Sequence, residues 1–163
     1  MKECADEKII RKYLSDYAEN IKIETVEIID STNDEMRKRA EKGEEEISLL
    51  IAEKQTKGRG TKGRSFFSPK NTGIYMSILL TPEKDRNPLL ITVDTAVCAA
   101  RVLEKITGEK TLIKWVNDIY INGKKVCGIL TEGCFSNKEI PDKIIIGIGV
   151  NIEKNFATKE IKD

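Results

Sequence analysis

The stretch 54–70 combines basic side chains with glycines and contains no acidic residue. Glycine lets backbone N–H groups approach an anion closely, and arginine offers a fork that matches phosphate or carboxylate. The pattern predicts an anion-binding loop, without the GxxxxGK[ST] spacing of a Walker A loop. A solvated surface loop, or a single-stranded nucleic-acid site with Phe66 and Phe67 as stacking groups, stays open. The residues that form the pattern are Lys54, Lys57, Arg59, Lys62, Arg64 and Lys70, with Gly58, Gly60 and Gly63.

A second stretch, 111–118, places one lysine among apolar residues. Lys114 lies inside a predicted strand, between Ile113 and Trp115. A lysine in such a strand either extends its ammonium group to water or is held against an anion. Asn117 and Asp118 follow, and this pair alone predicts only the turn that ends the strand.

Two shorter segments could also contact a ligand. Residues 30–33 (DSTN) are typical of a helix N-cap, and a helix N-terminus can offer N–H groups and hydroxyls to a ligand. Residues 147–151 (GIGVN) place glycines in a strand, which indicates close approach of a ligand or of another part of the chain. Capping alone explains the first segment, and packing explains the second equally well.

The residue types of the chain exclude several mechanisms. Its 163 residues include no histidine, which excludes Ser-His and Cys-His catalysis and histidine-ligated metals. Charged residues make up 34%, but the net charge is +1, so a global nucleic-acid footprint is absent. No cysteines are spaced as CxxC, and a disulfide scaffold would carry more of them. We therefore expect four free thiols, at Cys4, Cys98, Cys127 and Cys134.

Hydrophobic periodicity predicts the elements that must position these residues. Helical spacing predicts helices over 6–18 and 33–42, and one from Asn87-Pro88 to Gly108. Thr32 and Glu35 have the spacing of a capping box for the second helix. Asn122-Gly123 predicts a two-residue hairpin, and 54–72 a loop. Alternating or apolar runs predict strands at 21–29, 47–53, 73–80, 111–116, 118–121, 125–131 and 143–150.

The balance of these elements predicts the fold class. Strands outnumber helices and do not alternate with them one for one, which favours α+β: a mixed, mostly antiparallel β-sheet with helices packed on it. The run 143–150 is apolar on both faces, as in a central strand covered by helices. The chain has no apolar run of about 18 residues and no signal peptide, so we expect a soluble, cytoplasmic protein without a membrane partner.

Taken together and in this order, these segments resemble the motifs of biotin protein ligases. That family shows D/E-S-T-N, Q-x-x-G-R-G-R-x-G-R, K-W-P-N-D, G-I-L-x-E and G-x-G-x-N. The resemblance covers about residues 25–152 and implies the fold of biotin and lipoate ligases, which is like that of class II aminoacyl-tRNA synthetases. The matching segments here are 30–33, 55–64, 114–118, 128–132 and 147–151.

The resemblance implies a two-step reaction. The biotin carboxylate attacks the α-phosphate of ATP and pyrophosphate leaves. A lysine of a biotin carboxyl carrier domain, part of a biotin-dependent carboxylase, then attacks the biotinyl-adenylate and AMP leaves. Such a reaction needs no enzyme nucleophile, so we expect catalysis by positioning and by charge neutralisation. Mg²⁺ would accompany ATP, held largely by phosphates and water, and we name no metal ligand in the protein.

The resemblance also implies roles for individual residues. Lys114 is the expected catalytic cation between carboxylate and phosphate, and Arg59 supports the same charges. Asn117 is expected on the nucleotide side, and residues 58–64 as a lid over the adenylate. The expected binding residues are Ser31, Thr32, Asn33 and Gln55 for biotin; Gly58, Arg59, Gly60, Thr61, Lys62 and Arg64 in the lid; and Lys114, Asn117 and Gly128.

Two departures from the motifs concern the site. Thr61 stands where the family usually has arginine, and we expect this to loosen retention of the adenylate. Val116 stands where the family has proline, and we expect only an altered turn. We expect 1–163 to be a single catalytic domain, lacking the family's C-terminal part and small β-barrel. Only 29 residues precede Asp30, so we expect no N-terminal DNA-binding domain and no DNA partner. A homodimer is left open.

Three other functions compete with this interpretation. A lipoate ligase shares the fold and the adenylation chemistry, but its lysine motif usually lacks the K-W-x-N-D form. A binding module would hold biotin or nucleotide without transfer. A single-strand nucleic-acid binder using 54–70 would show strong salt dependence and indifference to biotin.

Overall fold

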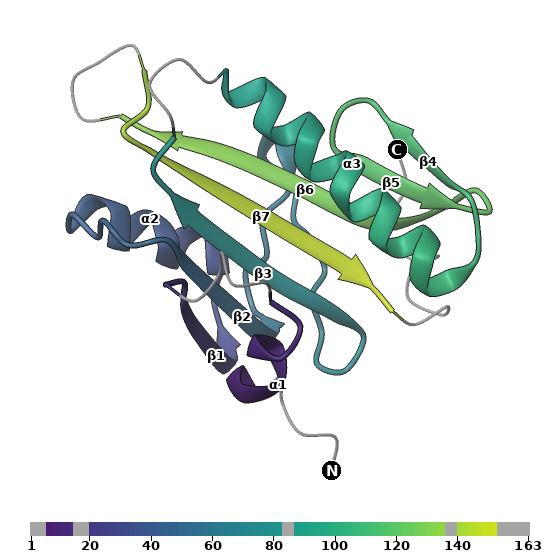
Figure 1. Cartoon of the computed structure of the whole chain (residues 1–163), viewed down its shortest axis with the longest axis horizontal. Coiled ribbons are helices and arrows are strands. Elements are labelled where there is room, and N and C mark those ends of the chain that lie inside the picture. The colour runs from purple at the N-terminus through teal and green to yellow at the C-terminus, as the bar shows by residue number, and fades with distance from the viewer. Residues whose placement is uncertain (1–5, 15–19, 83–86, 136–139, 153–163) are drawn as a thin grey trace.

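The segments predicted to be strands pair into one sheet in the computed structural model, which describes residues 6–14, 20–82, 87–135 and 140–152. The described strands lie in the order β1–β2–β3–β7–β6–β5–β4 (Figure 1). Among the described strands only β1 and β2 pair in parallel, so the predicted mixed, mostly antiparallel sheet is confirmed. The strands are β1 (Lys22–Ile29), β2 (Ser48–Gln55), β3 (Gly73–Leu80), β4 (Thr111–Lys114), β5 (Asp118–Ile121), β6 (Lys124–Cys134) and β7 (Lys143–Asn151).

Three α-helices accompany the described strands: α1 (Glu7–Arg11), α2 (Thr32–Glu41) and α3 (Pro88–Thr107). The long helix has the predicted ends, because the Asn87 side chain accepts a hydrogen bond from the Leu89 N–H and Gly108 adopts a φ of 71°. The Asn122-Gly123 hairpin is also confirmed, with φ values of 50° and 73° joining β5 to β6. Residues 15–18 of the first predicted helix lie outside the described residues.

Two local predictions need correction. The N-cap of α2 is Ser31 rather than Thr32, since the Ser31 hydroxyl accepts a hydrogen bond from the Asp34 N–H at 3.3 Å. Thr32 is instead drawn to β2, where its N–H and its hydroxyl both donate to Gln55 Oε1, at 2.8 and 3.1 Å. The strand predicted over 111–116 ends at Lys114, because the backbone turns before β5 begins.

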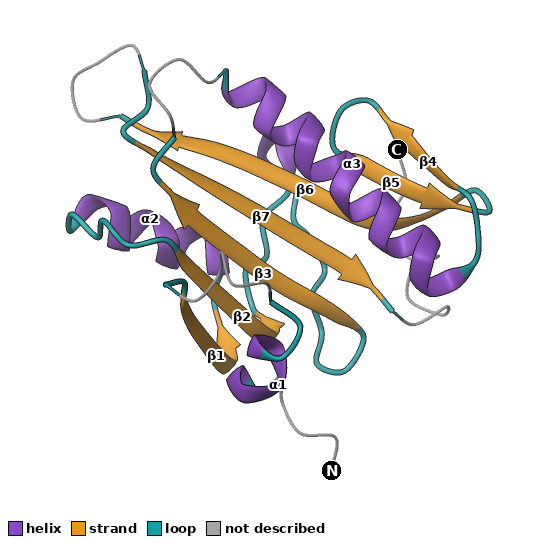
Figure 2. Ribbon diagram, in the orientation of Figure 1, coloured by secondary structure: helices purple, strands orange, loops and turns teal. Residues whose placement is uncertain are grey.

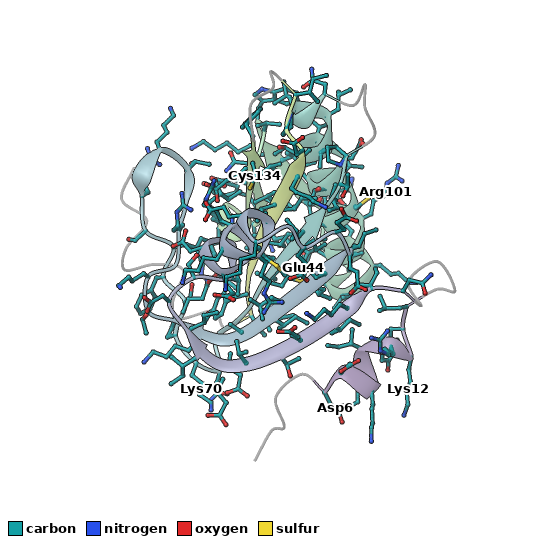
Figure 3. The ribbon with its side chains drawn as sticks, turned by 90° about the vertical axis from the view of Figure 1, so that its left-hand side faces the viewer. Asp6, Lys12, Glu44, Lys70, Arg101 and Cys134 are labelled. Atoms are coloured by element: carbon teal, nitrogen blue, oxygen red, sulfur yellow. The ribbon has the colours of Figure 1, made fainter. Side chains whose placement is uncertain are left out.

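The sheet separates two layers of different character. Along β7, Ile144, Ile146 and Ile148 point to the face that α3 covers, and Ile145 points to the face that α2 covers. This alternation confirms that β7 is a central strand with helices on both sides (Figure 2). Figure 3 views the sheet from one end, with Arg101 of α3 on one side and Lys70 of the loop 54–72 on the other. We call the side of the sheet that α3 covers the α3 face. We call the opposite side, on which α2 and the loop 54–72 lie, the pocket face.

Two further observations concern sequence predictions. Within the described residues, no helix is both long and apolar enough to cross a membrane. Cys98, Cys127 and Cys134 are free thiols, whereas Cys4 lies outside the described residues. Burial raises the pKa of the Cys127 thiol to about 12, so this side chain behaves as a neutral apolar group in the layer under α3.

Candidate active site

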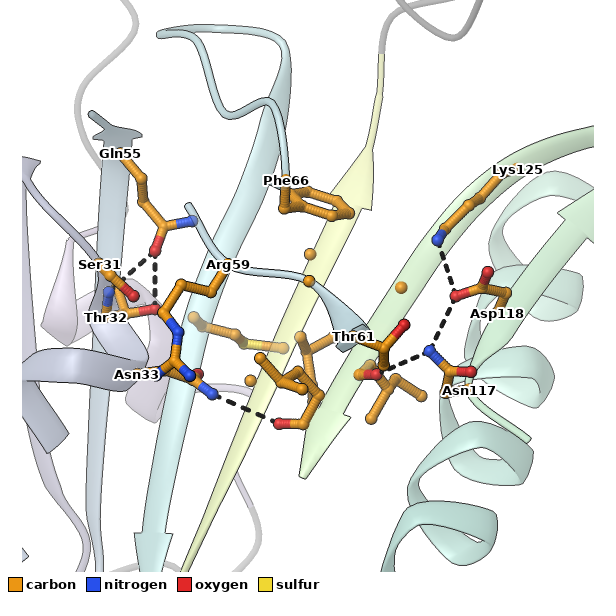
Figure 4. Close-up of a pocket in the computed structure, with 18 residues that line it drawn as sticks. Ser31, Thr32, Asn33, Gln55, Arg59, Thr61, Phe66, Asn117, Asp118 and Lys125 are labelled. Atoms are coloured by element: carbon orange, nitrogen blue, oxygen red, sulfur yellow. Dashed lines mark hydrogen bonds and ion pairs between the residues drawn. The ribbon is translucent and has the colours of Figure 1, made fainter. Parts of the chain in front are cut away.

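The pocket face carries a cavity between α2, the loop 54–72 and the middle strands (Figure 4). Most of the predicted binding residues line it: Ser31, Thr32, Asn33, Gln55, Arg59, Gly60, Thr61, Asn117 and Gly128. Gly58, Lys62, Arg64 and Lys114 do not. Nine further residues complete the lining. None was among the predicted binding residues, although the segment 147–151 was a candidate for close approach to a ligand and Phe66 for stacking. They are Phe66, Met76, Asp118, Lys125, Ile129, Leu130, Gly147, Ile148 and Gly149.

One wall of the cavity is a connected set of hydroxyls and amides. Gln55 accepts from Thr32 through Oε1, and its Nε2 donates to Ser68 Oγ at 3.0 Å. The Ser77 hydroxyl lies 2.6 Å from both Thr32 Oγ1 and Asn33 Oδ1. These side chains come from α2, β2, β3 and, for Ser68, the loop 54–72, so the sheet holds the start of α2 in one position. Because Thr32, Asn33 and Ser77 are buried, their hydrogen bonds keep the wall rigid and ready for a polar ligand.

Glycines on the pocket face of β6 and β7 make room for side chains of other segments. A Cβ on Gly147 would overlap the Asn33 amide, and one on Gly149 would lie 2.5 Å from the Phe66 ring. Gly128 faces Gly149 across the two strands and approaches the same ring. The sequence predicted that another group comes close to the backbone at the glycines of 147–151. The groups that do so are the side chains of Asn33 and Phe66.

The loop 54–72 has its own internal ladder. Gln55 pairs with Ser68 and Arg59 with Ser65, and the chain reverses at Lys62 and Gly63, whose φ values are 57° and 74°. Gly58 does not line the cavity. A Cβ there would collide with the Phe66 carbonyl oxygen and crowd the side chains of Gln55 and Ser68, so glycine allows the two arms of the loop to meet.

Asp30 anchors the start of this loop. Its carboxylate accepts hydrogen bonds from Thr56 Oγ1 at 2.5 Å and from Lys57 Nζ at 2.9 Å. The hydrogen bond from Thr56, followed by the Lys57 ammonium group, lowers the pKa of the Asp30 carboxyl. The first residue of the DSTN segment therefore fastens the loop, while the other three line the cavity.

Arg59 reaches from the loop into a cluster of carboxylates. Its guanidinium lies 2.6 Å from Asp34 Oδ1, and its two terminal nitrogens lie 2.9 and 3.2 Å from the two oxygens of Glu132. The side chain is 38% exposed and lines the cavity. Its positive charge therefore lies at the edge of the cavity and is balanced by the two carboxylates that it contacts.

A second cation, Lys125, lies on the far side of the cavity. Lys125 Nζ is 2.7 Å from Asp118 Oδ1, and the side chain is only 18% exposed. Asn117 is fixed beside it, because its Nδ2 donates to Ile129 O and to Asp118 Oδ1, both at 3.1 Å. Sequence reasoning missed Lys125, which lies between the two matching segments 114–118 and 128–132, three residues before Gly128.

A β-bulge explains how Lys125 reaches this face. Regular alternation along β6 would place it on the α3 face, with Cys127 and Ile129. The register shifts between Ile119 and Tyr120, so that Ile119 pairs with Cys127 but Tyr120 pairs with Lys125. The extra residue turns Lys125 to the pocket face.

Lys114 occupies the same face but lies at its margin. The transverse row of paired residues runs from Gly149 through Gly128 and Asp118 to Lys114 on the edge strand β4. Its Nζ lies 6.0 Å from the centre of the Tyr120 ring, and the residue is exposed. The structure therefore separates Lys114 from the cavity lining that contains Arg59 and Lys125.

Comparison with known proteins identifies the family. The model of the biotin/lipoate A/B protein ligase family matches residues 25–151. The bifunctional ligase/repressor BirA of Bacillus subtilis is 38% identical over 141 residues, which are 84% of this chain and 43% of that protein. BirA of Escherichia coli is 34% identical over 77% of this chain and 39% of its own length.

Solved structures agree with this match. Biotin protein ligase from Aquifex aeolicus in complex with biotin and ATP superposes with a TM-score of 0.72 and 34% identity, over 87% of this chain and 57% of that one. The chain thus spans less than half the length of these two BirA proteins and just over half of the Aquifex protein. The sequence match and the shared fold together establish that this chain belongs to the biotin/lipoate A/B protein ligase family.

Proposed function

We propose that this protein adenylates biotin with ATP and transfers the biotinyl group to a lysine of a biotin carboxyl carrier domain. The observation that carries the proposal is the cavity itself, in which a hydrogen-bonding wall faces two cations. Its relatives include proteins named biotin–[acetyl-CoA-carboxylase] ligase, from Paracoccus denitrificans and Mycobacterium tuberculosis. A carboxylase carrier domain is accordingly the proposed partner.

Some residues of the cavity bind biotin, and others neutralise the charges of the reacting groups. Thr32, Asn33 and Gln55 bind the ureido head of biotin, because their hydroxyl and amide groups can both donate and accept. Arg59 and Lys125 flank the point at which the biotin carboxylate meets the α-phosphate. An oxygen of the carboxylate forms the new P–O bond while the bond to pyrophosphate breaks, and the two cations offset the repulsion between the reacting anions.

The transfer step uses the same geometry. The carrier amine attacks the acyl carbon of the biotinyl-adenylate, the C–O bond to the phosphate breaks, and AMP leaves with the charge that the cations already neutralise. ATP is proposed to bind with Mg²⁺. In the described part of the chain no three His, Cys, Asp or Glu side chains gather as a metal site. Magnesium would be carried largely by the phosphates and water, and Asp118, the one carboxylate among the residues that line the cavity, could contact it.

Two lysines now compete for the catalytic role, and their variants decide between them. Lys114 is the candidate from the sequence, whereas Lys125 lines the cavity. We expect Lys125→Ala to lower the rate of pyrophosphate release about 10²–10³-fold and Lys114→Ala to lower it far less. Lys125→Arg should recover little, because a planar fork does not replace a compact ammonium group.

The assay measures pyrophosphate release with biotin and ATP, alongside a calorimetric biotin affinity for each variant. Lys124→Ala is the matched control, since Lys124 is the exposed neighbour of Lys125 at the hairpin. A larger loss in Lys114→Ala than in Lys125→Ala would return the role to Lys114. A wild-type chain that binds biotin but releases no pyrophosphate would make it a binding module, and release only with lipoate would make it a lipoate ligase.

The loop 58–64 is proposed to close over the adenylate. Its charges repel one another, and ordering its glycines costs entropy, so ligand contacts should slow its exchange with solvent. We expect amide exchange across 57–66 to slow when saturating biotin and ATP are added, and Gly108 at the C-terminal end of α3 to serve as the unaffected reference. Equal exchange with and without ligands would argue against a lid. A cytoplasmic location and a homodimer stay predictions.

A further inference from the structure

Glu132 is the one residue of the G-I-L-x-E segment whose side chain could carry charge, and it has no role in the scheme above. It lies on β6 two residues beyond Leu130, which lines the cavity, and its side chain is 14% exposed. Alternation along the strand places it on the pocket face with Gly128 and Leu130. A nearly buried carboxylate beside an anion site needs a reason, because it should repel the ligand.

The contacts of Glu132 suggest that reason. Its Oε1 accepts from Arg37 Nη2 at 2.8 Å and from Arg59 Nη2 at 2.9 Å. Its Oε2 accepts from Asn33 Nδ2 at 2.8 Å and from Arg59 Nη1 at 3.2 Å. One carboxylate therefore joins the polar wall, through Asn33, to the loop, through a bidentate pair with Arg59.

The second carboxylate on Arg59 is held differently. Asp34 lies at the start of α2, and its side chain is 42% exposed, three times the exposure of Glu132. Water already solvates both charges of an exposed ion pair, so replacing Asp34 by a ligand anion on Arg59 costs little free energy. Releasing Glu132 would break the contacts of three donor groups at once and leave a nearly buried charge unpaired.

We propose that Glu132 is a positioning residue that keeps Arg59 and Asn33 at the cavity, and that an anionic group of the ligand replaces Asp34 on Arg59. The inference rests on the proposed function, in which this group is either the biotin carboxylate or a phosphate of ATP. Glu132 thus acts through Arg59 and Asn33 without touching the reacting atoms. The two acids beside Arg59 then have opposite effects, one holding the arginine and the other competing with the ligand.

The test compares Glu132→Gln with Asp34→Asn. Glu132→Gln should raise KM for the substrate that Arg59 holds about 10–100-fold, the range expected for losing a charge-assisted pair, while kcat falls much less. Asp34→Asn should leave that KM within about threefold or lower it. The substrate whose KM responds, biotin or ATP, identifies the anion. Glu132→Asp, which keeps the charge on a shorter side chain, should recover part of the affinity.

A double variant separates positioning from general stability. If Glu132 acts through Arg59, adding Glu132→Gln to Arg59→Ala should raise KM by less than Glu132→Gln does alone. Full additivity would overturn the proposal, as would a Glu132→Gln protein that loses only thermal stability and kcat at unchanged KM. Tighter binding by Glu132→Gln would show that Glu132 competes with the ligand.

Calorimetric affinities for biotin and for ATP test the positioning role without turnover. If the wild-type chain binds either ligand but releases no pyrophosphate, the proposed reaction fails while the role of Glu132 is still decided by the affinity ratio. If the wild-type chain binds neither ligand, the positioning role fails together with the proposed function. If Glu132→Gln and wild type bind with equal affinity, the positioning role fails and the proposed reaction stands.

Discussion

The α3 face of the sheet is filled with aliphatic side chains, whereas the pocket face has an apolar cluster under α2 and, at the cavity, glycines and polar groups. The contrast is clearest along β7, where Ile144, Ile146 and Ile148 pack under α3. The residues that alternate with them face the other side of the sheet: Ile145 lies under α2, and Gly147 and Gly149 lie at the cavity. A single strand therefore contributes continuous apolar burial to one face and open space to the other.

This difference has an energetic consequence. Burial of aliphatic surface on the α3 face is non-directional and tolerates changes of shape at moderate cost. On the pocket face, Asn33, Thr32 and Ser77 are buried polar groups that depend on one another for hydrogen bonds. We therefore expect changes on the α3 face to act on stability, and changes on the pocket face to act increasingly on ligand binding.

The largest effect on stability is expected on the α3 face. Ile144 is fully buried and does not line the cavity. Ile144→Ala should lower the free energy of unfolding by about 2–5 kcal/mol, because it removes buried methyl groups and leaves a cavity. Urea unfolding measures the loss, and Ile144→Val, at about 0.5–1.5 kcal/mol, is the matched control. Biotin affinity of the folded protein should be unchanged, and a parallel loss of affinity would break the comparison between the faces.

A smaller loss of stability with a larger loss of binding is expected from Gly149→Ala. The new Cβ would lie 2.5 Å from the Phe66 ring, so the ring and the loop that carries it must move. We expect about 1–3 kcal/mol of destabilisation, as for overpacking elsewhere, and at least about tenfold weaker biotin binding. Calorimetry on Gly149→Ala beside Ile146→Val on the other face provides the test. Affinity equal to that of the wild type would mean that Phe66 is not required where it lies.

The loss of folding stability at low pH is expected to depend on an ion pair on the pocket side of the sheet, between Glu24 and Arg39. The hydrogen bond from Arg39, 2.7 Å away, lowers the pKa of the Glu24 carboxyl below its ordinary value, against the opposing effect of burial. Because the folded pKa lies below the unfolded one, the pair stabilises the fold above the unfolded pKa. This stabilisation is lost as the pH falls through the folded pKa.

The predicted size of this effect is modest. The Glu24 side chain is 35% exposed, so the pair should contribute at most about 1 kcal/mol. Urea unfolding of wild type and Glu24→Gln should differ by this amount near neutral pH and converge in acid. Under α3, the Cys127 thiol has a pKa of about 12 and stays neutral over this range. A difference between wild type and Glu24→Gln that persists unchanged into acid would remove the electrostatic explanation.

The same contrast explains what the sequence could predict. The strands, the Asn122-Gly123 hairpin and the ends of α3 follow from local patterns, because apolar alternation and turn chemistry act within a few residues. The motif residues Thr32, Asn33, Gln55 and Arg59 line one cavity, and their roles in binding stay predictions. Their convergence comes from strand order, which brings segments far apart in the chain together.

Errors arose where a tertiary contact outweighed a local rule. Thr32 has the spacing of a capping residue, but Gln55 of β2 takes both its hydroxyl and its N–H, and Ser31 becomes the cap. The catalytic role of Lys114 is a separate matter and stays a prediction, because the residue lies on the edge strand β4 and outside the cavity lining, where the variants have yet to test it. Lys125 reaches the cavity only because a bulge reverses its side, and no periodicity reveals a bulge in advance.

The smallest effect on stability, and a purely functional one, is expected at Thr61. This residue lines the cavity at the start of a short turn and stands where the family motif has arginine. Thr61→Arg should change the free energy of unfolding by less than about 0.5 kcal/mol, as is usual for surface positions. It would add a guanidinium that can pair with the phosphate of the adenylate, so bound intermediate should escape about tenfold less often. The measurement is biotin incorporation into a bystander protein and into a carrier domain, with Thr61→Ser as the matched control.

Pyrophosphate release is followed in parallel, so that a chain making no adenylate is recognised as a failure of the proposed reaction. Given adenylate formation, equal bystander labelling by wild type and Thr61→Arg would show that the loop does not control release through this position.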